Sequence, residues 1–245
     1  MKTLASFKKK DYAAALKDIY LRIDEMCLSS YGKTKLKSYT KAGESASPFS
    51  GGAVGDDIAL GCGCTANSAI ITADTIYVAN SGDSRSIVAK LSGKKYEAVE
   101  MSIDHKPELA EEKRRIEKAG GFVEENRVKG ILNLSRSLGD MEYKLDKKLA
   151  PEHQMITAVP EIKTIPITSD LKFLFIACDG IWDCLTSQEA AEFIGERVEK
   201  YRKAGKLSGI VEQMFDTIIA SDVASSEGIG CDNMTAVIIM FKNDE

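Results

Sequence analysis

The sequence has no apolar segment long enough to span a bilayer, and its first residues lack a signal-peptide core, since Lys8, Lys9 and Lys10 soon follow Met1. We therefore expect a soluble intracellular protein with no membrane partner, in the cytoplasm or alternatively in the nucleus. Long runs of one charge are also absent. With 33 basic and 37 acidic residues the net charge is −4, so a nucleic-acid groove is not indicated.

Side chains that usually hold zinc are sparse. Cys62-Gly-Cys64 hints at zinc or redox chemistry, but the paired Cys-x-x-Cys spacing of a structural zinc site is missing. The six cysteines lie mainly in apolar or glycine-rich surroundings, where a free cysteine behaves as a small hydrophobic residue. The two histidines, His105 and His153, are interpreted as structural or surface residues. At 245 residues and 44% hydrophobic, the chain can bury a full core.

Two acidic stretches adjoin apolar runs. Asp179 and Asp183 follow the run 173–177, and Asp232 precedes the run 236–241. Each run is typical of a strand buried on both sides, which would present its aspartate from a rigid element. Asp-Gly after a strand also suits an ordinary turn. A second carboxylate four residues after Asp179 would repel the first unless a cation or partner lies between, so the pattern favours a site for Mg²⁺ or Mn²⁺.

The rest of the chain alternates between strands and helices. Strands are predicted at 69–72, 76–80 and 86–90, and the short breaks at 73–74 and 81–83 indicate hairpins and thus an antiparallel sheet.

Helices are predicted after the N-cap Asp11, over 108–119 with a solvated charged face, after the capping box Thr186 to Glu189, and around 207–219. Residues 29–57 are predicted to form a long exposed connection.

Asp83, Asp179 and Asp232 share one local position, a polar turn at the end of an apolar strand. If those turns face one sheet edge, the three carboxylates form a metal cleft. For Asp83 alone, a local salt bridge with Arg85 explains the residue equally well.

Six motifs, in this order, resemble those of the metal-dependent protein serine/threonine phosphatases of type 2C. They are Gly63-Cys64-Thr65-Ala66, Val78-Ala79-Asn80-Ser81-Gly82-Asp83-Ser84-Arg85, Asp104-His105-Lys106-Pro107, Leu134-Ser135-Arg136-Ser137-Leu138-Gly139-Asp140, Cys178-Asp179-Gly180-Ile181-Trp182-Asp183 and Asp232-Asn233-Met234-Thr235.

The resemblance implies an α+β fold in which two stacked antiparallel β-sheets are flanked by α-helices, an α-β-β-α sandwich, with residues 1–245 forming a single catalytic domain. It also implies a pair of Mg²⁺ or Mn²⁺ ions that activate a water for attack on phosphoserine or phosphothreonine, so no catalytic side chain is assigned.

By motif match, Asp179 and Asp232 would bind a core metal, while Asp83 and Asp183, with Asp179, would bind a weaker third ion. Arg136 would lie near the substrate, or equally well would be buried against Asp140.

The resemblance is incomplete. The family's early motifs, an Arg followed by Met-Glu-Asp and then Asp-Gly-His-Gly-Gly, do not occur in these 245 residues. Those motifs carry the phosphate-binding arginine, the aspartate that bridges the metals and the histidine proposed to protonate the leaving group. We therefore expect a domain whose N-terminal strands are missing, with reduced metal affinity. If Met1 is the true start, phosphatase activity is expected to be very weak or absent.

Three functions fit these residues. The first is dephosphorylation of phosphoserine and phosphothreonine proteins, with a role in signalling. The alternative is a catalytically impaired pseudophosphatase that acts as a protein-binding or regulatory module. A third is an unrelated hydrolase in which Asp179 and Asp183 act as nucleophile and acid through a phosphoaspartate. The sequence does not specify the oligomeric state.

Overall fold

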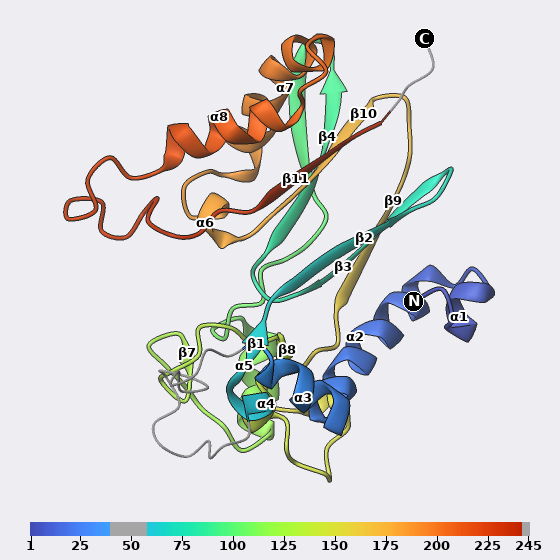
Figure 1. The fold of residues 1–245 in the computed structure, drawn as a ribbon, viewed down its shortest axis with the longest axis vertical. Coiled ribbons are helices and arrows are strands. Elements are labelled where there is room, and N and C mark those ends of the chain that lie inside the picture. Colours follow the sequence, from blue (N-terminus) through green and yellow to red (C-terminus); the bar gives the residue numbers. More distant parts are fainter. Residues whose placement is uncertain (40–57, 242–245) are drawn as a thin grey trace. The chain divides into compact units, whose positions relative to one another are not determined.

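The structure, a computed structural model, describes residues 1–39 and 58–241 (Figure 1). It combines helices with several sheets, and most of the strand pairs are antiparallel, which confirms the predicted α+β class. The chain divides into two compact units. Unit 1 comprises Met1–Ser68, Ala79–Asp83 and Asp104–Ile162, and unit 2 comprises Ala69–Val78, Ser84–Ile103 and Lys163–Glu245.

A four-stranded sheet forms the centre of unit 2. Its order is β11-β10-β4-β5, and each neighbouring pair is antiparallel. Side chains of β10 alternate between the two faces of the sheet, as a strand buried on both sides requires. The four strands are β4 (Arg85–Ser92), β5 (Lys95–Glu100), β10 (Leu171–Ala177) and β11 (Ala236–Met240).

Two helices cover one face of this sheet, α7 (Ser187–Lys203) and α8 (Ser208–Ile218) (Figure 1). The predicted capping box at the start of α7 is confirmed, because Thr186 Oγ1 accepts from the Glu189 amide at 3.2 Å and the Glu189 carboxylate accepts from the Thr186 amide at 2.8 Å. Phe173, Phe175 and Ala177 of β10 point into this core.

A second sheet has the order β2-β3-β9, with β2 (Ala66–Ile71), β3 (Thr75–Ser81) and β9 (Glu161–Pro166). Within unit 2, Ile76 and Val78 of β3 pack against Val88 and Leu174 of the four-stranded sheet, so the two sheets share an apolar core. The predicted stacking of two sheets is therefore confirmed.

The hairpin predicted at residues 81–83 is wrong. Strands β3 and β4 lie in different sheets, so the short break passes the chain from one sheet to the other. Gly82 has φ +115°, and a Cβ at this position would lie 2.5 Å from Thr65 Cγ2, so the turn requires glycine. A short break between two apolar strands does not by itself distinguish a hairpin from a crossing between sheets.

Unit 1 is built around helix α2 (Tyr12–Leu28), whose N-cap Asp11 accepts from the Ala14 amide at 3.0 Å, as predicted. The Tyr20 hydroxyl donates to the Ala79 carbonyl at 2.9 Å and thereby ties α2 to the end of β3. The remaining elements are α1 (Ala5–Lys8), α3 (Ser30–Lys37), α4 (Ile58–Gly61), β1 (Gly63–Cys64), α5 (Ala110–Lys118), β6 (Val123–Glu124), β7 (Arg127–Val128), β8 (Leu138–Gly139), η1 (Met141–Tyr143) and η2 (Pro151–His153).

The predicted connection over 29–57 is wrong in its first part, because residues 30–37 form α3, with Ser29 capping it through the Gly32 amide at 3.0 Å. Residues 40–57 lie outside the described residues. Within 1–39 and 58–241, none of the helices has the combination of length and apolar character that crossing a membrane would require.

Candidate metal centre

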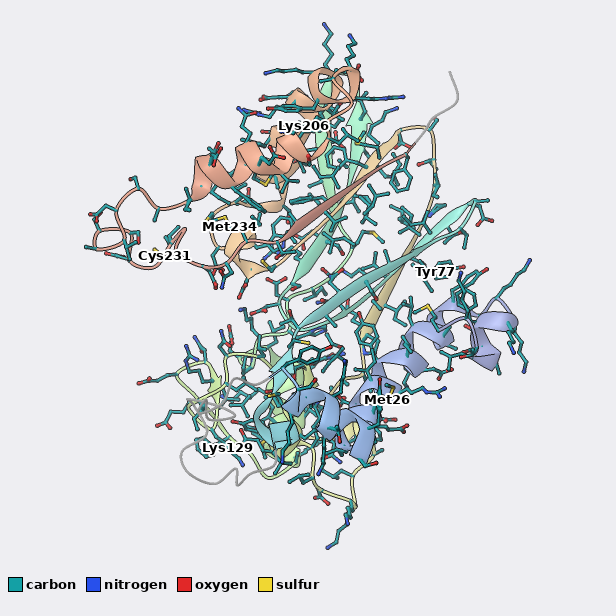
Figure 2. The ribbon with its side chains drawn as sticks, viewed as in Figure 1. Met26, Tyr77, Lys129, Lys206, Cys231 and Met234 are labelled. Atoms are coloured by element: carbon teal, nitrogen blue, oxygen red, sulfur yellow. The ribbon has the colours of Figure 1, made fainter. Side chains whose placement is uncertain are left out.

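Asp179 and Asp232 stand at one end of the β10–β11 pair. The register places Ala177 opposite Ala236, and the Cys178 amide donates to the Thr235 carbonyl at 3.1 Å, so pairing continues to the edge of both turns. Cys231 and Met234, labelled in Figure 2, bracket the second turn. The two aspartates thus leave the sheet on neighbouring turns, although they are 53 positions apart in the chain.

Gly180 allows these turns to approach closely. A Cβ at this position would lie 2.4 Å from the Asn233 carbonyl oxygen and 3.4 Å from Asp232 Cβ. Each carboxylate accepts from the next backbone amide, Asp179 from Gly180 at 3.0 Å and Asp232 from Asn233 at 2.6 Å. Asp179 is half-buried and Asp232 is exposed. Two oxygen-rich side chains are therefore presented from two tightly packed turns.

Trp182 holds the turn that carries Asp179. This turn is the short helix α6 (Asp179–Trp182), and the indole Nε1 donates to the Ala177 carbonyl at 2.8 Å. The ring packs edge-on against Phe175 with centroids 5.4 Å apart, and the Arg85 guanidinium lies 5.1 Å from the ring centroid. The packed indole limits the freedom of Asp179.

Asp183 follows α6 and is exposed. Its amide donates to the Asp179 carbonyl at 2.8 Å, so the two residues are one helical turn apart. Asp83 belongs to unit 1, is only 2% exposed and forms an ion pair with Lys106. The ammonium group already neutralises this carboxylate, which none of the sequence interpretations included.

Arg136 lies in a buried network of charges in unit 1. Its guanidinium pairs with the Glu112 carboxylate at 2.6 Å and donates to the Val159 carbonyl at 3.1 Å. Arg115 pairs with the same carboxylate at 2.6 Å, and the Ser135 hydroxyl also donates to it at 2.6 Å. Arg136 is therefore largely buried, as one of its two interpretations predicts, but the carboxylate it pairs with is Glu112 and not Asp140.

Glu112 is the residue that sequence reasoning missed, because its helix had been assigned a solvated charged face. Its side chain is 5% exposed. Burial by itself raises the pKa of Glu112, but the hydrogen bond from Arg136 and the charges of Arg115 and Arg136 outweigh it and lower the pKa to about 2. No local pattern signals this role, since Glu112 and Arg136 are 24 residues apart.

Comparisons with known proteins agree with these motifs. The protein phosphatase 2C family profile matches residues 6–226. A probable protein phosphatase 2C 4 of Paramecium tetraurelia is 41% identical over 238 residues, which cover 97% of this chain and 73% of that protein. The chain belongs to the protein phosphatase 2C family. Its predicted family is thus confirmed, and by membership it is a protein phosphatase of this type.

Other phosphatase 2C proteins are also similar to this chain, in sequence or in fold. A probable protein phosphatase 2C 21 of Arabidopsis thaliana is 48% identical over 180 residues, covering 74% of this chain and 48% of that protein. The solved serine-threonine phosphatase 2C of Toxoplasma gondii aligns with 99% of this chain and 72% of its own at a TM-score of 0.65. At 20% identity, that structure supports the fold alone.

The described side chains supply only some of the ligands that a divalent cation needs. In the described ranges, no three His, Cys, Asp or Glu side chains gather closely enough to form a metal cluster. Asp179 and Asp232 nevertheless supply hard oxygen ligands from adjacent turns, and Mg²⁺ is commonly held by one or two carboxylates with water completing its shell. The pair therefore supplies part of the ligand set that such a cation requires.

His105 supports the turn that precedes Asp83. Its Nδ1 accepts from the Gly82 amide at 3.3 Å, while its Nε2 is buried without a hydrogen-bond partner among the described residues. Burial, followed by the positive charge of Arg136, lowers the pKa of His105 to about 4. The folded phosphatase therefore favours the neutral imidazole.

A depressed histidine pKa makes the protein sensitive to acid. The stabilisation that the folded protein gains by holding His105 neutral is complete above the unfolded pKa of 6.5. It is lost as the pH falls from 6.5 towards the folded pKa of about 4. We expect this group to lower the free energy of unfolding by roughly 1–2 kcal/mol between pH 6.5 and pH 5. Urea denaturation at several pH values should show this loss, and His105→Asn should remove it. If His153→Asn, a change at the exposed histidine, removes the loss equally, the assignment to His105 is wrong.

Proposed function

We propose that this chain dephosphorylates phosphoserine and phosphothreonine in protein substrates with the help of Mg²⁺ or Mn²⁺, and that residues 1–245 form a single catalytic domain for this purpose. The observation that carries the proposal is the close approach of the two turns that hold Asp179 and Asp232. Alignments over 97% of the chain with phosphatase 2C relatives support it.

We assign the following roles to residues of this chain. Asp179 and Asp232 would hold the cation, and Asp183 is proposed for a weaker third ion, to which Asp83, already paired with Lys106, is not assigned. Gly180 keeps the turns in contact, and Trp182 keeps α6 against the sheet. When bound, the cation supplies a lowered pKa for water and neutralises phosphoryl charge. Arg136 is proposed near the substrate, where Glu112 would fix its orientation.

Metal binding tests the assignment directly. Asp179→Asn and Asp232→Asn should each weaken Mn²⁺ binding by about tenfold or more, because each removes a negative ligand from a site with few of them. Isothermal titration measures the affinity, and the fluorescence of Trp182, the only tryptophan of the chain, reports binding independently.

Asp170→Asn is the matched control, since Asp170 is a partly exposed aspartate just before Leu171, at the opposite end of β10 from Ala177. Unchanged Mn²⁺ affinity in both Asp179→Asn and Asp232→Asn would rule out their role as ligands. Equal weakening in Asp170→Asn would indicate only a general effect of charge.

A pseudophosphatase is the second candidate, favoured by the lack of a three-ligand cluster within the described residues. Hydrolysis of a phosphothreonine peptide with Mn²⁺ separates the two functions. Ordinary turnover that Asp179→Asn abolishes supports the phosphatase, while Mn²⁺ binding without turnover supports a protein-binding or regulatory role.

A further inference from the structure

Helix α5 lines a pocket in unit 1 with one of its faces. Glu111, Arg114, Arg115 and Lys118 follow the spacing i, i+3, i+4 and i+7, which places them along one stripe of the helix. Leu149 and His153 complete the lining of this cavity of about 360 Å³. A volume of this size is about ten times the share of one water in the liquid, so a polyatomic ion fits inside.

Positive charge predominates in the α5 pocket. Two arginines and a lysine face a single lining carboxylate, Glu111, whereas the whole chain carries a net charge of −4. Arg114 and Lys118 form no ion pair or hydrogen bond through their side chains with other described residues, so their charges are not neutralised within the fold. The pocket is therefore a local basic site on an acidic protein.

Arg115 makes one wall of the pocket rigid. Its guanidinium pairs with Glu112 at 2.6 Å and donates to the carbonyls of Ser135 at 2.5 Å and Gln154 at 3.1 Å. Glu112 is shared with Arg136, so these three residues together retain a positive charge. The partial negative charge at the C-terminal end of α5 opposes an anion, and Lys118 in that last turn offsets it.

We propose that the α5 pocket binds a phosphate group. Guanidinium and ammonium groups are the side chains that bind phosphate oxygens most strongly, through charge-assisted hydrogen bonds. Two sources share this chemistry: inorganic phosphate, and a second phosphorylated side chain of a substrate protein, the latter resting on the function proposed above. The α5 pocket belongs to unit 1, whereas Asp179 and Asp232 belong to unit 2.

Phosphate titration of the full chain in the presence of EDTA tests this site without metal or turnover. Arg114→Ala and Lys118→Ala are each expected to weaken binding of inorganic phosphate by about tenfold, and Glu111→Gln to strengthen it about threefold. Lys113→Ala is the matched control, because Lys113 is an exposed cation of the same helix that does not line the pocket. Circular dichroism verifies that each variant is folded.

Two results would overturn the proposal: no effect of Arg114→Ala and Lys118→Ala, or an equal effect of Lys113→Ala. Tighter binding of a phosphoserine peptide than of inorganic phosphate assigns the site to a substrate side chain, and equal binding assigns it to free phosphate. Asp179→Asn should leave this binding unchanged, so a failure of the proposed phosphatase activity is distinguished from a failure of the α5 site.

Discussion

Glu112→Gln is expected to lower the free energy of unfolding by roughly 3–5 kcal/mol, the usual cost of removing one partner from a buried ion pair. The change leaves Arg115 and Arg136 with side chains only 11% and 19% exposed and with no carboxylate between them. Urea denaturation followed by circular dichroism measures the loss.

The neighbouring Glu111→Gln is the control for Glu112→Gln. It makes the same chemical change at an exposed position of the same helix, where effects within about 0.5 kcal/mol are usual. If Glu112→Gln costs less than about 1 kcal/mol, the buried network does not hold this region together.

The pKa of Glu112 adds a dependence on pH to the same measurement. A carboxyl whose pKa is lowered on folding stabilises the protein above its unfolded pKa of 4.5, and the stabilisation is lost as the pH falls through about 2. The wild type should therefore lose stability in this range, and Glu112→Gln should lose less.

Phe175→Ala is expected to cost about 3–5 kcal/mol of stability, because it removes a large side chain from a core that cannot fully close around the gap. Phe175 is completely buried on β10, between Ile87 of β4 and Ile238 of β11, and its ring packs against Trp182. The indole would lose its edge-on contact, so α6 and Asp179 would also become less ordered.

The fluorescence of Trp182 during urea denaturation measures both effects of Phe175→Ala, through the transition midpoint and the native emission wavelength. Phe122→Ala is the matched control, since Phe122 is 51% exposed and its removal creates no cavity. A loss of stability no greater than in Phe122→Ala would contradict the proposed packing of β10.

Local interactions explain why much of the secondary structure is predictable. Asp11 caps α2 and Thr186 caps α7 through hydrogen bonds that span only three residues. Similarly, β10 appears as a continuous apolar run because both of its faces are buried. In each case the physical cause and the sequence pattern occupy the same short segment.

The placement of charges in α5 was not predictable in this way. Glu111 and Glu112 are adjacent acids with the same local context, yet one is exposed and the other is buried between two arginines. Which of them is buried depends on Arg136 and Ser135, more than twenty residues away. The α5 pocket also needs Leu149 and His153 from a distant segment.

By itself the sequence determined strands β2, β3, β4, β10 and β11, helices α2, α5, α7 and α8 and the six ordered motifs of the phosphatase 2C family, because these depend on short-range periodicity, capping and turn chemistry. Only the tertiary structure decided that β3 and β4 enter different sheets, that Arg136 pairs with Glu112, and that Asp179 and Asp232 leave the sheet on touching turns. The physical reason is that strand partners and buried ion pairs are chosen by the packing of the whole chain, which no single segment encodes.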